Sequence, residues 1–222
     1  MKTRIVLSFI LALAATGAMA QDKLIRIIDN PDSSRKRPQV VFYDSEKTRL
    51  LMPQEATFGV ECIPSFTPEW TLTYDSLTCS LVYKEAQKSI WHATWTAWRK
   101  PKGKSGRKKP AWRKHPKDYE APDVNTFKCA ITSEQMAMLQ AIWTSAVGSA
   151  EDREDGMLDG VTWIYFINGQ RAKGRSDKLP FVKFTNELAN AVRNGDASRT
   201  DSLIGNEFQR IVTGLEIVSS LE

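Results

Sequence analysis

The sequence predicts an α+β protein in which an antiparallel sheet carries two or three amphipathic helices packed on one face. Apolar side chains alternate with period two in several runs before residue 132, for example in Phe58–Cys62. Helical spacing replaces this alternation afterwards, as at Leu139, Ile142 and Trp143. Asn168-Gly169 follows between two β-rich runs, and this dipeptide is the strongest short signal for a β-hairpin.

The first twenty residues have the features of a secretory signal peptide. Lys2 and Arg4 precede an apolar run, and Ala18-Met19-Ala20 is a small-x-small cleavage motif. We therefore expect cleavage before Gln21 and export to the periplasm or the medium. The residue directly after the motif is Gln21 and not a cysteine, and no second long apolar segment exists, so we expect neither a lipid anchor nor a transmembrane segment. Residues 21–222 are expected to form a single domain.

Short strands are predicted for the first half of the mature chain. Their residues are β-branched, aromatic or alternating, and polar or proline-containing stretches separate them. Asp75-Ser76 is expected to turn the chain between two of them, giving a hairpin. The predicted strands are 23–28, 39–43, 58–62, 70–74 and 77–83.

The tryptophan-rich run Ile90–Trp98 is predicted to be another strand, with Trp91 and Trp95 on one face. The role of its tryptophans can be interpreted in two ways. They pack into the core and hairpin, or Trp91, Trp95 and Trp98 form a platform on which sugar rings stack. The alternating run 126–131 is expected to pair with this strand.

The segment Arg99–Asp118 would then be a long basic hairpin loop, and it is the main functional candidate. It contains ten Lys or Arg and one Asp. The full chain has 31 basic and 26 acidic residues, so removal of this segment, Lys2 and Arg4 leaves 19 basic and 25 acidic residues, a net charge of −6. Such a segment cannot form a core, and we expect a solvated loop that binds a polyanion. The alternative is a solvated loop without a dedicated ligand.

The predicted binding residues are Arg99, Lys100, Lys102, Lys104, Arg107, Lys108, Lys109, Trp112, Arg113 and Lys114. Among them, Trp112 is suited to stack on a base or sugar.

The second half is mainly helical. Thr132 and Gln135 have the spacing of a capping box, which predicts a helix to about Val147. Strands 161–167 and 170–173 follow, then two amphipathic helices. The apolar stripes of these helices are Phe181, Phe184, Leu188 and Val192, and Ile204, Phe208, Ile211 and Leu215.

An acidic stretch, Glu151–Asp159, precedes the first of those strands. It fails the EF-hand pattern, because Arg153 occupies a position that needs a calcium ligand. We interpret it as a solvated acidic linker.

The chain has three cysteines, Cys62, Cys79 and Cys129. In an oxidising compartment one disulfide is expected, with Cys62–Cys79 as the preferred pair, and three buried free thiols are the alternative. There is no Cys-x-x-Cys motif, and only His92 and His115 could assist, so neither a metal nor a cofactor is expected.

Motifs typical of enzymes are not recognisable in the sequence. No Gly-x-Ser-x-Gly nucleophile turn occurs, and Gly103-Lys104-Ser105 lacks the glycine spacing of a phosphate-binding loop. The one arrangement to test is Cys129 with His92, provided that their two predicted strands pair. Catalysis is therefore not the favoured interpretation.

The segment from Phe127 onward resembles a layout found in uncharacterised secreted bacterial proteins. The similarity lies in a helix that starts near Ser133-Glu134-Gln135, the run Asp159–Phe166, a hairpin containing Gly169–Ala172 and a terminal helix containing Thr185–Leu188. The signal peptide and the polar-aromatic composition also look like envelope proteins of Bacteroidota. The resemblance implies fold and location, and no activity, cofactor or catalytic residue.

These observations predict an exported envelope protein that acts as a non-catalytic binding module. Its basic loop would bind an anionic envelope polymer or a protein partner, and a sequence-specific nucleic-acid target is not expected. Two alternatives stay open: an assembly or interaction subunit whose partner surface lies elsewhere, and a hydrolase with an unrecognised site.

Overall fold

The predicted α+β class is confirmed by a computed structural model, which describes residues 23–27, 37–99, 113–152 and 160–219. Seven strands form one sheet in the order β1-β7-β6-β2-β3-β4-β5, and every neighbouring pair is antiparallel. The predicted signal peptide lies outside the described residues. The strands are β1 (Ile25–Arg26), β2 (Ala56–Ile63), β3 (Trp70–Asp75), β4 (Ser80–Ala86), β5 (Val124–Ala130), β6 (Thr162–Ile167) and β7 (Gln170–Gly174).

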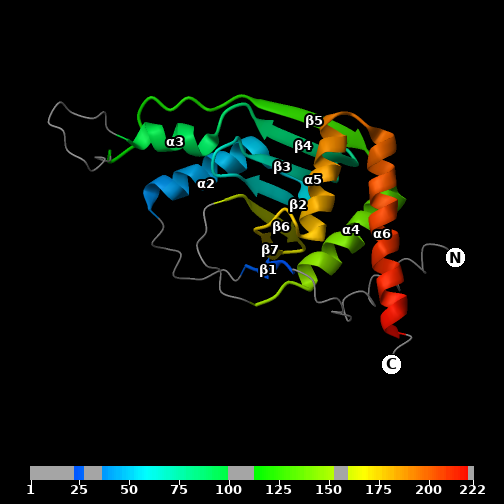
Figure 1. The fold of residues 1–222 in the computed structure, drawn as a ribbon. Coiled ribbons are helices and arrows are strands. Elements are labelled where there is room, and N and C mark those ends of the chain that lie inside the picture. The colour runs from blue at the N-terminus through cyan, green and yellow to red at the C-terminus, as the bar shows by residue number, and fades with distance from the viewer. Residues whose placement is uncertain (1–22, 28–36, 100–112, 153–159, 220–222) are drawn as a thin grey trace.

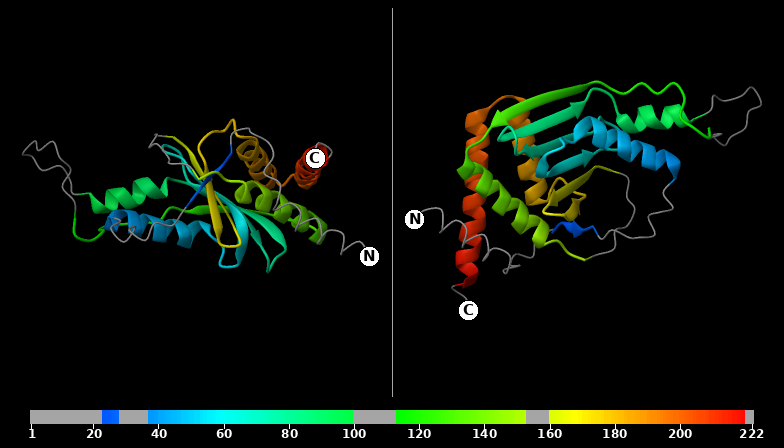
Figure 2. Two further views of the ribbon diagram at one scale, coloured as in Figure 1. Left: turned by 90° about the horizontal axis from the view of Figure 1, so that it is seen from below. Right: turned by 180° about the vertical axis from the view of Figure 1, so that it is seen from behind.

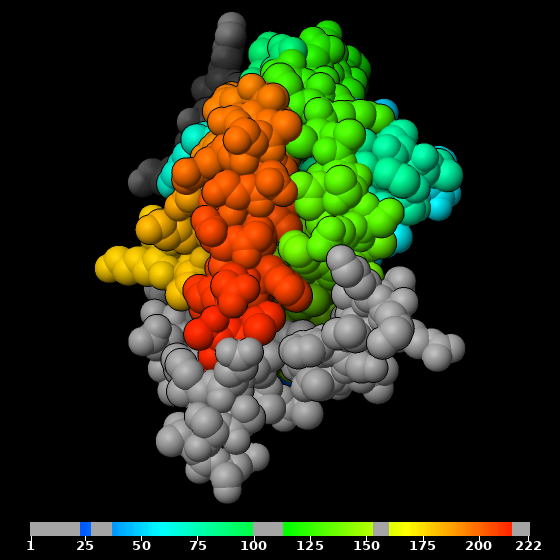
Figure 3. Space-filling view, turned by 90° about the vertical axis from the view of Figure 1, so that its right-hand side faces the viewer, coloured from blue at the N-terminus to red at the C-terminus, as the bar shows by residue number. Residues whose placement is uncertain are grey.

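The three predicted amphipathic helices are present: α4 (Ser133–Gly148), α5 (Pro180–Arg193) and α6 (Ala197–Ser219). The helices α4 and α5 pack on the sheet, and α6 packs on both of them. Figure 3 shows α6 lying along the outside of this layer. The apolar stripe of α5 is buried against the strands, as the 3.6-residue period predicts.

Trp143 of α4 shows how closely this layer approaches the sheet. Its indole N–H donates to the backbone carbonyl of Gly59 in β2 at 3.0 Å. A side chain at position 59 has no room, because its Cβ would lie 2.5 Å from the carbonyl oxygen of Leu72. The indole therefore fixes α4 on β2, and the glycine permits the close approach of β2 to β3 beside the register shift between Ala56 and Gly59.

Local sequence signals explain two further elements. Thr132 and Gln135 form the predicted capping box at the start of α4, with both reciprocal hydrogen bonds present. Asn168 and Gly169 both have positive φ angles, 49° and 77°, and connect β6 to β7 as a two-residue hairpin turn. The turn between β3 and β4 is longer than predicted, because β4 begins at Ser80 and leaves Leu77 exposed.

Two predicted strands are helices in the structure. Residues 39–43 belong to α2 (Pro38–Leu51), and the tryptophan-rich run forms α3 (Ile90–Trp98). Both sequences are rich in Val, Ile, Thr and aromatic residues, which favour strands, but tertiary packing overrides this preference. The helices α2 and α3 pack together and lie on the opposite side of the molecule from α4, α5 and α6 (Figure 2).

The predicted hairpin loop at 99–118 is wrong for the same reason. Because Ile90–Trp98 is helical, β5 pairs with β4 in continuous register from Val124 to Ala130. The basic segment therefore connects the end of α3 to β5, and it does not join two paired strands.

The structure does not pair Cys62 with Cys79, and all three cysteines are free. Cys62 lies opposite Trp70, whereas Cys79 precedes Ser80, which lies opposite Asp75. Five residues along a strand correspond to roughly 17 Å. A disulfide requires Cα atoms within roughly 7 Å.

Thiol reactivity should distinguish the three cysteines. Cys79 is exposed, whereas Cys62 and Cys129 are buried. Burial, assisted by the charge of Glu69, raises the pKa of the Cys62 thiol to about 12. Since the thiolate is the reactive form, Cys62 should stay unreactive at pH 8. We expect a thiol-specific reagent to modify one cysteine in the native protein and three after unfolding in denaturant.

The control is Cys79→Ser, which should remove the rapid reaction and leave the other two unchanged. A denatured chain that yields only one reactive thiol before reduction would instead show that a disulfide forms.

Candidate functional site

The helix α3 begins on a buried carboxylate. Glu69, immediately before β3, has no exposed surface, and its oxygens accept hydrogen bonds from the backbone N–H groups of Ile90 at 2.7 Å and Trp91 at 2.9 Å. Ser89 caps the same helix by accepting from the N–H of His92 at 3.1 Å. A helix N-terminus presents free donors and a partial positive charge, so it compensates for the burial of the carboxylate.

The helix α2 is attached to the sheet beside Glu69. Tyr43 is buried, and both its burial and the neighbouring Glu69 raise the pKa of its hydroxyl. Lys47, one helical turn further, forms an ion pair with Glu61 of β2, and both side chains are largely buried. The hydroxyl of Thr71 donates to the carbonyl of Leu51, at the end of α2, at 2.9 Å. Two polar contacts, the Lys47–Glu61 ion pair and the Thr71–Leu51 hydrogen bond, therefore fix α2 on the sheet face opposite the main core.

Aromatic contacts join the outer parts of the two helices. Phe42 of α2 packs edge-on against Trp98 of α3 and against Tyr119, with ring centroids 6.2 and 5.1 Å apart. Burial, together with the nearby carboxylate of Glu46, raises the pKa of Tyr119 to about 12. The connection between α3 and β5 thus returns along α2 and packs against it.

Backbone hydrogen bonds close the basic segment where it leaves α3. The N–H of Arg113 donates to the carbonyl of Trp98 at 2.9 Å, and the N–H of Lys117 donates to the carbonyl of Ala97 at 3.0 Å. The guanidinium of Arg113 also donates to the carbonyl of Arg99 at 3.3 Å. These donors satisfy carbonyls at the C-terminus of α3, which a helix leaves free. We call Arg99, Arg113, Lys114 and Lys117 the neck of the basic segment.

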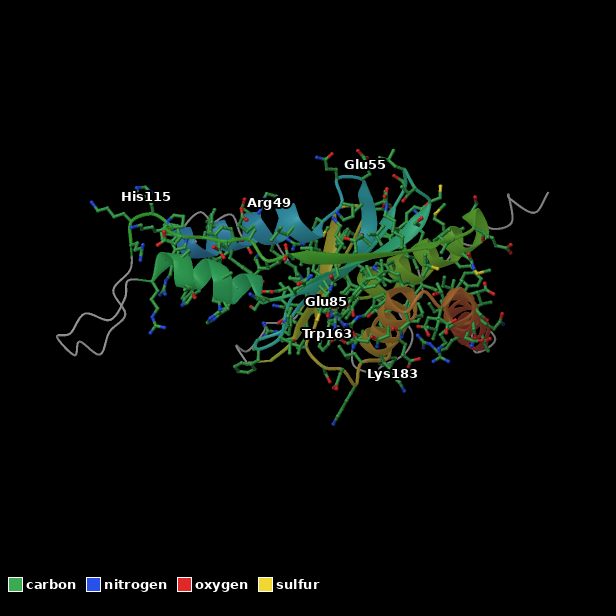
Figure 4. All side chains as sticks on the ribbon, turned by 90° about the horizontal axis from the view of Figure 1, so that it is seen from above. Arg49, Glu55, Glu85, His115, Trp163 and Lys183 are labelled. Carbon is green, nitrogen blue, oxygen red and sulfur yellow. The ribbon has the colours of Figure 1, made fainter. Side chains whose placement is uncertain are left out.

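The neck lies at the end of the α2–α3 pair that is remote from the sheet. Figure 4 shows His115 there, far from Trp163 and Lys183 on the body. Within the described chain, no neck residue forms an ion pair. Arg99, Lys114 and Lys117 are exposed, and Arg113 is half-buried. The other predicted binding residues lie outside the described residues. They are Lys100, Lys102, Lys104, Arg107, Lys108, Lys109 and Trp112.

The α-helical form of Ile90–Trp98 also creates a surface that the strand prediction missed. Ile90, Thr94, Ala97 and Trp98 form its buried face. The opposite side presents a row that we call the α3 stripe. Trp91 and Trp95 stack there with centroids 4.6 Å apart, and Trp91 remains 37% exposed. The stripe consists of Trp91, His92, Trp95, Thr96 and Arg99, at helical spacing.

The dyad considered from the sequence is not assembled. His92 is exposed on α3, whereas Cys129 is buried on β5 opposite Leu81. Leu81 is five residues from Ala86, the end of β4 nearest to α3, so roughly 17 Å of strand separates the two regions. No group of three or more His, Cys, Asp or Glu suited to a metal occurs among the residues that the structure describes.

The acidic stretch after α4 has a structural contact at its start. The carbonyl of Glu151 accepts from the N–H of Arg26, and Asp152 pairs with the side chain of Arg26 at 2.9 Å. The rest of this stretch, 153–159, is outside the described residues. In the described ranges, no helix is long and apolar enough to cross a membrane.

Comparison with known proteins gives no relative on which an assignment could rest. No family model matches the chain, and neither a curated protein nor a solved structure matches it. The resemblance to secreted Bacteroidota proteins therefore stays a prediction.

Removal of the Glu69 carboxylate should destabilise the protein. Glu69→Ala would leave two buried N–H donors without an acceptor, and we expect a loss of about 3 kcal/mol in the free energy of unfolding. Glu69→Gln keeps one acceptor oxygen and should cost less. Urea denaturation followed by circular dichroism measures both variants. Equal stability of Glu69→Ala and the wild type would show that the carboxylate does not hold α3.

Proposed function

We propose that the protein is an exported binding protein that captures an anionic polymer with the basic segment Arg99–Asp118. The neck is the observation that supports this proposal best. Backbone bonds from Arg113 and Lys117 hold both ends of the segment at the tip of α3. The four cations of the neck therefore lie together at the end of α3, and the rest of the mature sequence carries the opposite net charge.

The separation of the positive basic segment from the negative remainder of the chain favours the binding of a polyanion. A polyanion carries condensed counterions, and lysines and arginines that replace them gain the entropy of counterion release. The ten basic residues of the segment stand against a single Asp, whereas the remainder of the mature chain carries more acidic than basic residues. A polymer is therefore attracted to the segment and repelled by the body, which orients the complex.

An envelope location would define the ligands on offer. If the predicted signal peptide directs export, the polyanions within reach are the phosphate surface of lipids, acidic glycans and extracellular DNA. Arginine and lysine recognise the phosphate, sulfate or carboxylate groups of all three. The proposed ligand is a polyanion, and we expect its binding to weaken as the salt concentration rises.

Replacement of residues 100–112 by a short Gly-Ser linker tests the proposal. This variant keeps Arg99 and Arg113, and hence the neck. We expect an unchanged melting temperature, because the hydrogen bonds at the end of α3 persist. Retention on immobilised heparin should fall to that of a weakly binding protein, and the dependence of binding on salt should become shallower because fewer cations release counterions.

Two variants of full length serve as controls. One changes the six basic residues between 100 and 112 to Gln, and the other exchanges Lys and Arg at the same six positions. The Gln variant should lose retention and the exchanged variant should keep it. Unchanged retention of the linker variant would contradict the proposal and favour a partner surface elsewhere on the protein.

A further inference from the structure

We infer that the α3 stripe is a carbohydrate subsite, so that the polymer captured by this protein is an acidic polysaccharide. The inference rests on the proposed function and names its ligand class. It depends on a feature that the basic segment does not explain: a stacked pair of indoles on the solvent side of a nine-residue helix.

The exposure of Trp91 is unusual for its surroundings. The other side of α3 buries Ile90 and Trp98 almost completely, at 0% and 6% exposure, yet Trp91 keeps 37% of its surface in solvent. Trp95 supports it from one side at 4.6 Å, and Tyr43 contacts it edge-on at 5.0 Å. Two neighbours thus hold the indole in a fixed orientation, and a fixed aromatic surface binds a ring with little loss of side-chain entropy.

The chemistry of the stripe suits a sugar. Pyranose rings have flat C–H faces that pack on an indole, while their hydroxyl groups need hydrogen-bonding partners at the rim. His92 and Thr96 are exposed beside the tryptophans and offer such partners. The stripe is also narrow and interrupted by polar side chains, which differs from the broad apolar centre of a stable protein interface.

The neutral stretch between the indole and the charges suits a polysaccharide better than duplex DNA. Trp91 and Arg99 are eight positions apart, which corresponds to about 12 Å along a helix. No Lys, Arg, Asp or Glu lies between them. Duplex DNA carries one phosphate per about 3.4 Å on each strand, so a strand at that spacing would place about three phosphates over this neutral stretch. The acidic groups of a polysaccharide project from the edges of its rings, so a ring face can pack on Trp91 while acidic groups reach the neck, whereas the bases of a duplex are stacked inside it and cannot pack on an indole.

The stripe and the neck form one continuous track. Trp91, Trp95 and Arg99 follow one another at intervals of four residues, and the guanidinium of Arg113 donates to the carbonyl of Arg99 at 3.3 Å. A chain that stacks on Trp91 and follows α3 therefore reaches the first cation of the basic segment, Arg99, at the C-cap of the helix. We assign stacking to the tryptophans and charge neutralisation to the neck.

Two polyanions separate these roles: heparin, which has sugar rings, and inorganic polyphosphate, which has none. With the full chain we expect Trp91→Ala to weaken heparin binding about tenfold, from the loss of one stacking contact, and to leave polyphosphate binding unchanged. Trp91→Phe should keep most of the affinity for heparin. Phe66→Ala, which removes an exposed aromatic side chain outside the stripe, is the matched control, and thermal melts of all variants check that the fold is intact. Tryptophan fluorescence should respond to heparin in the wild type and respond less in Trp91→Ala.

Each other outcome has a defined meaning. If the wild type binds neither heparin nor polyphosphate, the proposed function itself fails. If it binds both and Trp91→Ala changes neither, or weakens both equally, the polyanion proposal stands and the carbohydrate subsite is wrong. If single-stranded DNA or vesicles of anionic lipid bind more tightly than heparin and this binding depends on Trp91, the ligand class is wrong.

Discussion

A single buried carboxylate determines where the proposed binding surface lies. Glu69 has no contact with solvent and accepts two backbone N–H groups of α3. A helix of nine residues is too short to be stable alone, so its ends must be held by the rest of the protein. Glu69 holds the N-terminus, and the N–H groups of Arg113 and Lys117 hold the C-terminus. The indoles and the neck keep their positions because both ends are satisfied.

The polar contacts beneath α2 make the attachment specific. A buried carboxylate and a buried ion pair, Lys47–Glu61, cost desolvation energy that apolar residues would not. In return, Glu69, Lys47 and Thr71 each have a partner at one defined position, on α3, β2 and α2 respectively. The main core on the other face is mostly apolar and adds neutral hydrogen bonds such as the one from Trp143 to Gly59, whereas the buried charged side chains Lys47 and Glu69 lie on the side that carries the basic segment.

Elements that depend on interactions between residues close in sequence were predicted correctly, whereas elements that depend on contacts between distant residues were not. The capping box at Thr132, the Asn168-Gly169 turn and the stripe of α5 are local patterns, and the structure confirms them. The helices α2 and α3 were missed because β-branched and aromatic residues dominate their sequences, and because Lys47 interrupts the apolar period of α2. Ser89 before Ile90 was an available helix-start signal, but its acceptor role becomes evident only once α3 is helical.

The sequence by itself determined the fold class, the three helices on the main core and the concentration of positive charge between residues 99 and 118. These properties depend on periodicity, turn chemistry and composition, which are readable within a short window. Only the tertiary structure decided that the tryptophan run is a helix, that Trp91 is exposed and that the basic segment is closed at its base. The physical reason is that Glu69, twenty-one residues before Ile90, provides the acceptor that stabilises the first turn of α3, and no local pattern encodes that contact.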